Sequence, residues 1–196
     1  MDNRRARSAA TQRALMRAAE KLIADRGIEN VAVRDIVAAA GQKNESALQY
    51  HFKHLKGLIH AIHAARDVEI QATRTEMLQR VNERAAPPSL REICQLMVGP
   101  AFQLARDKPD FRRYIKAFGH EITLTDKSAV SIAKRKGGAS VVETGALLRA
   151  ALSHLDDSAY QRRLDGALRF ISASMVHQRG RSRHSRGATE SFFTTV

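Results

Sequence analysis

The sequence predicts an all-α protein. Apolar residues recur at helical spacing along most of the 196 residues. Only four prolines interrupt the chain, tryptophan is absent, and aromatic residues make up 5% of the composition, which disfavours a β-sandwich. A hydrophobic fraction of 43% supplies enough apolar side chains for one or two small domains with real cores.

Three helices are predicted in the first third of the chain. The first runs from Ser8 to Arg26 and ends at Gly27. A short second helix runs from Val33 to Ala40, where apolar residues recur four positions apart. Gly41 can adopt the left-handed conformation at little cost, so it predicts the turn into a third helix.

The third helix has an apolar side and a polar side. Leu48 and Phe52 lie four residues apart and face inward. The residues that then face outward are Ser46, Gln49 and Tyr50. Two starts of this helix remain open: a cap at Asn44, or a capping box of Ser46 with Gln49. We prefer Asn44, because the later start leaves barely one helical turn. A helix pair with a glycine turn and a polar outer face indicates a helix-turn-helix that enters a DNA major groove.

These residues resemble a known family. VRDIVAAAG followed by LQYHF is similar to the N-terminal domain of the TetR (tetracycline-repressor-like) transcriptional regulators. The resemblance implies a helix-turn-helix domain at residues 1–54 and a helical effector-binding and dimerisation domain at residues 55–196. It also implies a homodimer that binds a near-palindromic operator of double-stranded DNA. A small-molecule effector would release this dimer from the operator.

The chain departs from the family pattern near the third helix. The turn from Gly41 to Asn44 is one residue longer than usual. Gln49 stands where the family has a phosphate-contacting tyrosine, Tyr50 follows one position later, and Leu55 stands where the family has a lysine. These departures concern the individual DNA contacts and leave the expected fold unchanged.

The candidate DNA-binding residues lie on the second and third helices and directly after them. Glutamine can pair with adenine through two hydrogen bonds, alanine and tyrosine can contact a thymine methyl group, and lysine and histidine suit phosphates. Arg34 either contacts DNA or forms a surface ion pair with Asp35. The full set is Arg34, Lys43, Asn44, Ser46, Ala47, Gln49, Tyr50, His51, Lys53 and Lys56.

Positive charge is spread along the whole chain. The net charge is +13, and residues 1–60 hold 11 Lys and Arg against 6 Asp and Glu. This charge favours a polyanionic partner, although a charge run is also often a solvated face. Two interpretations of the stretch with Arg4, Arg5 and Arg7 remain open: an arm that enters a minor groove when DNA binds, or a solvated tail.

Beyond the third helix, the pattern predicts longer helices. A helix from Leu55 to Arg84 would be about 40 Å or more in length and could link the two domains. Two prolines end it, and a capping box of Ser89 with Glu92 begins a helix through Arg106. Another helix begins near Pro109.

The end of the chain is predicted to supply the dimer interface. We expect a helical stretch from Asp126 to Leu155 with a break at Gly137-Gly138, then a helix from Ser158 to Gln178. The apolar face of that helix, with a final helix begun by two phenylalanines, is the candidate interface: Leu164, Leu168, Ile171, Met175, Phe192 and Phe193. Residues 179–187 are an expected flexible basic loop, and we expect the polypeptide to continue past Val196.

A ligand pocket is expected among the helices of the C-terminal domain. The candidate lining residues are mostly large and apolar: Met97, Phe102, Phe118, His120 and Phe170. With basic residues nearby, they favour a largely apolar, anionic ligand. The alternative is that these side chains are simply core.

Other chemistry is not expected. His60, His63 and Asp67 share a face of the long helix, but such residues are ordinary on an exposed helix, so we expect no metal and no cofactor. The sequence contains no phosphate-binding loop, nucleophile elbow or CxxC, so we do not expect an enzyme.

We expect the single cysteine, Cys94, to be buried and to behave as a small apolar residue. Without a membrane span or a signal peptide, the protein is expected in the cytoplasm.

Together these features predict a sequence-specific DNA-binding transcriptional regulator that acts as a repressor and responds to a ligand. A repressor is preferred, and an activator remains open. The alternative from another class is an architectural or constitutively DNA-bound helical protein without an effector. A third interpretation, a helical adaptor that binds other proteins, would show no salt-sensitive DNA affinity.

Overall fold

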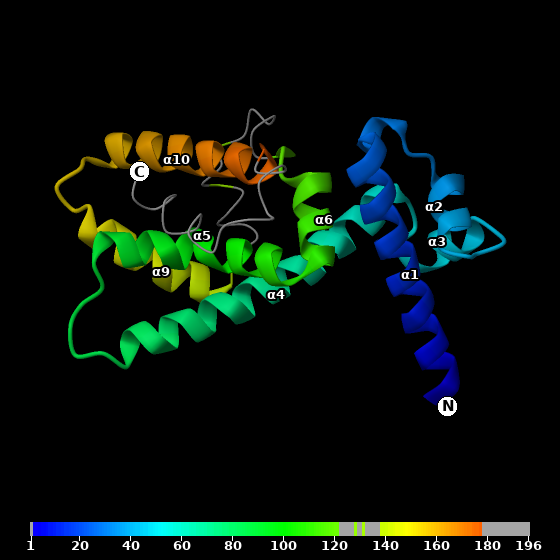
Figure 1. The fold of residues 1–196 in the computed structure, drawn as a ribbon, viewed down its shortest axis with the longest axis horizontal. Coiled ribbons are helices and arrows are strands. Elements are labelled where there is room, and N and C mark those ends of the chain that lie inside the picture. The colour runs from blue at the N-terminus through cyan, green and yellow to red at the C-terminus, as the bar shows by residue number, and fades with distance from the viewer. Residues whose placement is uncertain (1, 122–127, 129–130, 132–137, 178–196) are drawn as a thin grey trace. The chain divides into compact units, whose positions relative to one another are not determined.

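The computed structural model describes residues 2–121, 128, 131 and 138–177. All the regular elements within these ranges are helices, which confirms the predicted all-α class (Figure 1). In chain order they are α1 (Asp2–Arg26), the 3-10 turn η1 (Ile28–Asn30), α2 (Val33–Ala39), α3 (Ser46–Phe52), α4 (Leu55–Asn82), α5 (Leu90–Asp107), α6 (Pro109–Phe118), α9 (Ala139–Ala151) and α10 (Asp157–His177).

The chain divides into two compact units. The first unit takes in the described residues up to Glu69, together with Ala105–Phe118. The second unit takes in Ile70–Leu104 and the described residues from Gly119 onward. The long helix α4 therefore contributes to both units. The predicted functional division into residues 1–54 and 55–196 remains a prediction.

The structure corrects the predicted start of the first helix. It begins at Asp2 rather than Ser8, so the three arginines that were expected in an arm or a tail are helical. The physical reason lies in composition, because alanine and arginine are among the best helix-forming residues. The end of this helix is confirmed at Gly27, which has a positive φ of 80°.

The core of the first unit forms where α1 packs against its neighbours. α1 contacts α2, α3, η1 and α6. The side chains that it buries with α2, α3 and α4 are mostly aliphatic: Leu15, Ala19, Ile23, Ile36, Val37, Leu48, Leu58 and Ile62. Burying one large aliphatic side chain of this kind contributes about 1.5–3 kcal/mol to folding.

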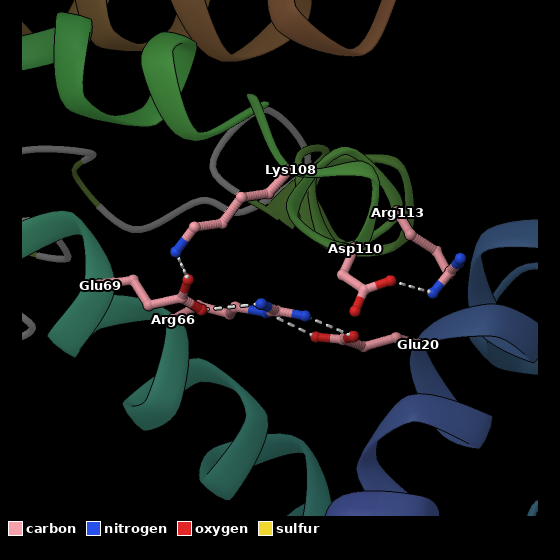
Figure 2. A network of polar contacts seen from close by, with 6 residues as sticks. All are labelled: Glu20, Arg66, Glu69, Lys108, Asp110 and Arg113. Carbon is pink, nitrogen blue, oxygen red and sulfur yellow. Dashed lines mark hydrogen bonds and ion pairs between the residues drawn. The ribbon is translucent and has the colours of Figure 1, made fainter. Parts of the chain in front are cut away.

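A network of charged side chains joins α1, α4 and the start of α6 (Figure 2). Arg66 donates two hydrogen bonds to Glu20, from Nε to Oε1 at 2.9 Å and from Nη2 to Oε2 at 2.8 Å. Its Nη1 donates to Glu69 Oε1 at 2.7 Å, and Lys108 Nζ donates to Glu69 Oε2 at 2.7 Å. We call Glu20, Arg66, Glu69 and Lys108 the Arg66 network.

Within the Arg66 network, the pair of Arg66 with Glu20 is shielded from water, whereas the Lys108 side chain is 52% exposed. Glu20 is only 2% exposed, and the Arg66 guanidinium lies 5.8 Å from the ring centre of Phe111 and 5.9 Å from that of Tyr114. Burial acts to lower the pKa of Arg66, but the hydrogen bonds and charges of Glu20 and Glu69 outweigh it and raise that pKa. Burial acts to raise the pKa of Glu69, but its bonds to Lys108 and Arg66 lower it.

A helical hairpin of α4 and α5 begins the second unit. The predicted capping box is confirmed: the Ser89 backbone N–H donates to Glu92 Oε2 at 2.8 Å, and the Glu92 N–H donates to Ser89 Oγ at 3.3 Å. Arg84 Nη1 adds a hydrogen bond to Glu92 Oε1 at 2.6 Å. α4 ends at Asn82, two residues before the predicted end at Arg84.

A buried arginine compensates for the proline inside α5. Pro100 has no N–H, so the carbonyl of Leu96 lacks its usual helical partner. Arg74 Nε donates to that carbonyl at 3.0 Å, and its Nη2 donates to the Met97 carbonyl at 3.3 Å. This arrangement lets α5 continue through the proline to Asp107.

α5, α9 and α10 enclose an apolar cluster. Ile93, Leu148 and Tyr160 form its buried centre, and the side chains packed against them are Met97, Leu147, Leu152, Leu155 and Leu164. α9 begins at Ala139 after an extended Gly138, as a break there predicts, but Gly137 lies outside the described residues. The helix ends at Ala151 rather than at the predicted Leu155. α10 begins at Asp157, one residue before the predicted start, and Asp156 Oδ1 accepts the N–H of Ala159 at 2.8 Å.

Several predictions fall outside the described residues. They concern most of the stretch between Asp126 and Gly137, the loop at residues 179–187, and the final helix with Phe192 and Phe193. Within the described ranges, no helix is both long and apolar enough to cross a membrane.

Candidate nucleic-acid interface

The turn between α2 and α3 is fixed by backbone hydrogen bonds. Gly41 has a φ of 68°, as predicted for a left-handed residue after a helix. The N–H of Gly41 donates to the Ala38 carbonyl at 3.0 Å, and that of Gln42 donates to the Val37 carbonyl at 3.0 Å. This pair of bonds is the Schellman motif, which satisfies the last carbonyls of α2 and sets the exit direction of the chain.

The start of α3 matches neither predicted alternative. The helix begins at Ser46 with Glu45 as its N-cap, and no side chain caps it. Asn44 Oδ1 instead accepts the backbone N–H of Ser46 at 2.8 Å, which forms an Asx turn just before the helix. Consequently α3 is seven residues long, and its outer face is short.

α3 keeps one face in the core and presents the other to solvent. Leu48 is buried, whereas Phe52 is only half-buried. Ser46, Gln49 and Tyr50 are exposed as predicted, and Tyr50 is 77% exposed. A tyrosine that exposed has no structural role in the core, so it is available for an external partner.

The junction from α3 to α4 is strained. Lys53 has φ 66° and ψ −46°, and the His54 N–H donates to the Phe52 carbonyl at 2.8 Å. These values describe a γ-turn of the positive-φ kind, which is rare for a residue with a side chain. His54 Nδ1 then accepts the N–H of Gly57 at 3.0 Å and so caps α4. The sequence carried no signal for this turn, because lysine does not favour positive φ.

Exposed cations surround the outer face of α3. Lys43, Lys53 and Lys56 are exposed, and the Arg34 side chain on α2 is 82% exposed. Arg34 also lies 3.8 Å from Asp35, so the predicted surface ion pair is present without burying the guanidinium. Such long, hydrated side chains can reach phosphate oxygens from the edges of a major groove.

α1 contacts α3 directly through a hydrogen bond that the sequence did not reveal. Gln12 Nε2 lies 3.3 Å from His51 Nδ1. His51 is half-buried, and its ring packs edge-on against that of Tyr50 at a centroid distance of 4.9 Å. His51, which is predicted to contact a phosphate, therefore also helps to hold α1 beside α3. Ala47 is half-buried as well, and Asn44 is exposed.

The residues predicted to line a ligand pocket divide between the two units. Met97, Phe102, His120 and Phe170 belong to the second unit, whereas Phe118 belongs to the first. Phe118 is buried, with its ring centre 4.9 Å from that of His63. In contrast, Phe170 is 57% exposed.

A cleft of about 250 Å³ lies elsewhere on the second unit, at the α4–α5 hairpin. Its lining mixes apolar and charged side chains: Met77, Arg80, Val81, Arg84, Glu92, Gln95 and Leu96.

The histidines considered as metal ligands have different environments. His60 is exposed, whereas His63 is buried and its Nδ1 lies 3.0 Å from the Tyr114 hydroxyl. Across the described ranges, no three side chains of His, Cys, Asp or Glu gather as a metal site would require. Burial raises the pKa of the half-buried Cys94 thiol, which makes the thiolate less accessible.

The candidate dimer face on α10 is neither core nor open surface. Leu164, Leu168, Ile171 and Met175 are all half-buried, and Leu164 packs against the apolar cluster of the second unit.

Of the comparisons with known proteins, the family match is confined to the first unit. Residues 15–62 match the family of bacterial regulatory proteins, tetR family. No curated protein matches the chain. Among solved structures, the chain is similar to a candidate TetR-family transcriptional regulator from Mesorhizobium loti MAFF303099, with 15% identity. That alignment covers 86% of this chain and 98% of the other, at a TM-score of 0.41.

Proposed function

We propose that this protein, whose residues 15–62 belong to the TetR family of bacterial regulatory proteins, recognises a specific DNA operator through α3. The match of residues 15–62 to that family supports DNA-binding transcriptional regulation as the function class. The observation that carries the finer proposal is the exposed row of Ser46, Gln49 and Tyr50 on the outer side of α3, flanked by exposed lysines. α3 enters the major groove, where these side chains read base edges while Arg34, Lys43, Lys53 and Lys56 contact phosphates.

Gln49 is the residue best suited to read a base. Its amide can form two hydrogen bonds with adenine, and nothing in the core needs it. Gln49→Ala should weaken binding to the operator by about 1–3 kcal/mol and relax the preference at one base pair. Lys56→Ala is the matched comparison, because it should weaken binding to all DNA and lower the salt slope by about one. Equal losses for Gln49→Ala on operator and random DNA would overturn the proposed contact.

The operator itself can be obtained even though the regulated genes are unknown. Selection of duplexes from a random pool by the purified protein yields the preferred sequence, and binding is then measured at several salt concentrations. A specific regulator retains a marked preference for the selected duplex over random DNA. An architectural DNA-binding protein, the alternative, would show salt-sensitive binding with little preference.

The protein acts as a homodimer in this proposal. One seven-residue recognition helix reads only a few base pairs, so useful specificity requires two heads about 34 Å apart. The proposed contact is the α10 face with Leu164, Leu168, Ile171 and Met175, and the exposed Phe170 adds apolar surface to the same helix. The other predicted interface residues, Phe192 and Phe193, lie outside the described residues. Sedimentation should show a dimer at micromolar concentration, and Leu168→Glu should dissociate it. A wild-type monomer that binds the operator tightly would contradict this part.

A small-molecule effector is proposed to release the DNA, which would make the protein a repressor. Within the second unit, the proposed lining is Met97, Phe102 and His120, because Phe118 belongs to the first unit and Phe170 is exposed. A ligand can shift the equilibrium only if it binds the DNA-incompetent state better, by about 1–3 kcal/mol for a useful switch. Since the sequence contains no tryptophan, Met97→Trp introduces a single fluorescent reporter beside the apolar cluster. Metabolites that release DNA should change this fluorescence; release without any change would exclude this position.

A further inference from the structure

We propose that the first turns of α1 form a second DNA-contacting element, a basic helix that contacts backbone phosphates beside the groove that α3 enters. The inference rests on the proposed function, since it concerns the same complex with duplex DNA. It goes beyond that function by assigning a role to Arg4, Arg5 and Arg7.

The start of α1 is helical and extends beyond the helices it packs on. α1 runs without a break from Asp2, and in Figure 1 its N-terminal turns project past α2 and α3. Arg4, Arg5 and Arg7 are all exposed. At about 1.5 Å per residue, Arg4 lies about 12 Å along the helix axis from Gln12.

One face of this extension is oriented by the contact with α3. The hydrogen bond between Gln12 and His51 turns that side of α1 toward α3. Arg5 precedes Gln12 by seven residues, which is nearly two full helical turns, so it lies on the same side about 10 Å further along. Arg4 lies about 100° around the helix from Arg5, and Arg7 lies about 140° around it from Gln12, so Arg5 and then Arg4 are nearest to the side turned toward α3. The extension therefore continues the predicted DNA-facing surface of the first unit.

The charge of the extension matches a phosphate backbone. Residues 3–19 contain five arginines and no acidic residue. Arg13 and Arg17 are exposed further along the same helix. Arginine forms bidentate hydrogen bonds with phosphate oxygens, and each phosphate neutralised releases counterions.

The helical conformation determines which part of the DNA this element can reach. A minor groove is about 6 Å wide, whereas a helix with its side chains is about 10–12 Å across, so the extension cannot enter a minor groove as an extended arm would. A major groove is about 12 Å wide and is assigned to α3. A helix that lies beside α3 can therefore contact the phosphates along the edge of that groove. A helix holds its arginines at fixed spacing, so less ordering is required on binding than for a disordered arm.

The test compares wild type with a variant carrying Arg4→Ala, Arg5→Ala and Arg7→Ala. The probe is the duplex selected from a random pool, with about 10 base pairs added on each side. Binding is measured between about 50 and 200 mM salt. The slope of log affinity against log salt should fall by roughly 0.9 for each phosphate that a head no longer binds, with a weaker affinity at every salt concentration. The matched control removes three exposed arginines of the second unit, Arg80, Arg91 and Arg163, and should leave the slope unchanged.

Two further measurements separate this inference from its alternatives. Ala6→Pro keeps all the arginines but breaks the helix ahead of Arg7. It should reproduce most of the affinity loss; unchanged binding would mean that the arginines act from a flexible tail and would overturn the helical contact. Trimming the added flanks from the duplex should reduce the difference between wild type and the triple variant.

The outcomes also distinguish this inference from the proposed function. If wild type binds the selected duplex with a strong salt dependence while the triple variant binds with the same affinity and slope, only the role of the α1 extension is overturned. If wild type shows no salt-dependent DNA binding at all, the proposed function fails and this inference fails with it.

Discussion

Both units have largely apolar cores, but the core of the first unit also contains a shielded ion pair. In the first unit, the buried pair of Arg66 with Glu20 extends to Glu69 and the half-exposed Lys108, and so joins three segments that are far apart in the sequence. In the second unit, Ile93, Leu148 and Tyr160 join three helices through apolar contacts. Apolar contacts are non-directional, whereas the bidentate Arg66–Glu20 pair is satisfied in only one geometry. The unit that carries the candidate DNA interface thus has the more geometrically demanding core.

This difference has a consequence for stability. A buried ion pair contributes little net stability, because desolvation offsets most of the attraction, but removing one partner leaves an uncompensated buried charge. An apolar core loses only the transfer free energy of the deleted atoms plus a cavity term. The first unit should therefore be the more sensitive to single substitutions at its centre.

The largest effect is expected from Arg66→Ala. It leaves Glu20, which is 2% exposed, without its partner and should destabilise the first unit by about 3–5 kcal/mol. Denaturant unfolding monitored by circular dichroism measures this. The matched control is Arg113→Ala, which removes an arginine paired with Asp110 at a half-buried site and should cost about 1 kcal/mol or less.

A double substitution sharpens the same point. Glu20→Leu combined with Arg66→Met replaces the pair by apolar side chains and should recover most of the stability lost in Arg66→Ala. If the double variant is as unstable as the single one, then the fit of the network to its surroundings, rather than the unpaired charge, is what α1 and α4 depend on.

A somewhat smaller loss is expected from Leu148→Ala in the second unit. Leu148 is buried between Ile93 and Tyr160, so its truncation should cost about 2–5 kcal/mol through reduced burial and a cavity. Leu148→Met conserves volume and should cost less than about 1.5 kcal/mol. Thermal unfolding compares the two variants. A loss for Leu148→Ala that exceeds that of Arg66→Ala would reverse the proposed ranking of the two cores.

The features that sequence patterns predicted are local ones. The turn at Gly41 and the capping box of Ser89 with Glu92 each depend on residues within a few positions of one another, so the sequence displays them directly. The predicted cap at Asn44 was wrong, because α3 begins one residue further on, after Glu45. The exposed side of α3 followed from the same helical spacing, since Leu48 fixed which face is buried.

The features that were missed depend on distant residues or on unusual backbone conformations. Glu20 and Arg66 are 46 positions apart, and a charged residue on a helix ordinarily indicates a solvated face. His63 looked like an exposed residue for the same reason, but it is buried against Tyr114 and Phe118. The extension of α1 was missed because helix ends are set by weak preferences that no single residue marks.

A third prediction concerns strain, which the described ranges show at one non-glycine residue, Lys53 of the first unit. Lys53→Gly removes the steric cost of positive φ and should stabilise the first unit by about 1 kcal/mol. Lys53→Ala removes the same charge but keeps a Cβ, so it should leave stability nearly unchanged. Comparing both variants in denaturant unfolding separates strain from charge. If glycine and alanine give the same stability, the γ-turn is not strained.

The smallest effect is expected from acid titration of the capping box in the second unit. Hydrogen bonds from Arg84 and from the Ser89 backbone and side chain lower the pKa of Glu92 from 4.5 to about 2. Because the folded state holds the carboxylate in its charged form, the stability that Glu92 contributes is fully present above pH 4.5 and is lost as the pH falls toward 2. Wild type should therefore be more stable than Glu92→Gln at neutral pH, and the difference should shrink as the pH falls through this window. Denaturant midpoints of both proteins, measured in steps down to about pH 2, check this, and a difference that stays constant would show that the charge of Glu92 has no part in holding α5 to the end of α4.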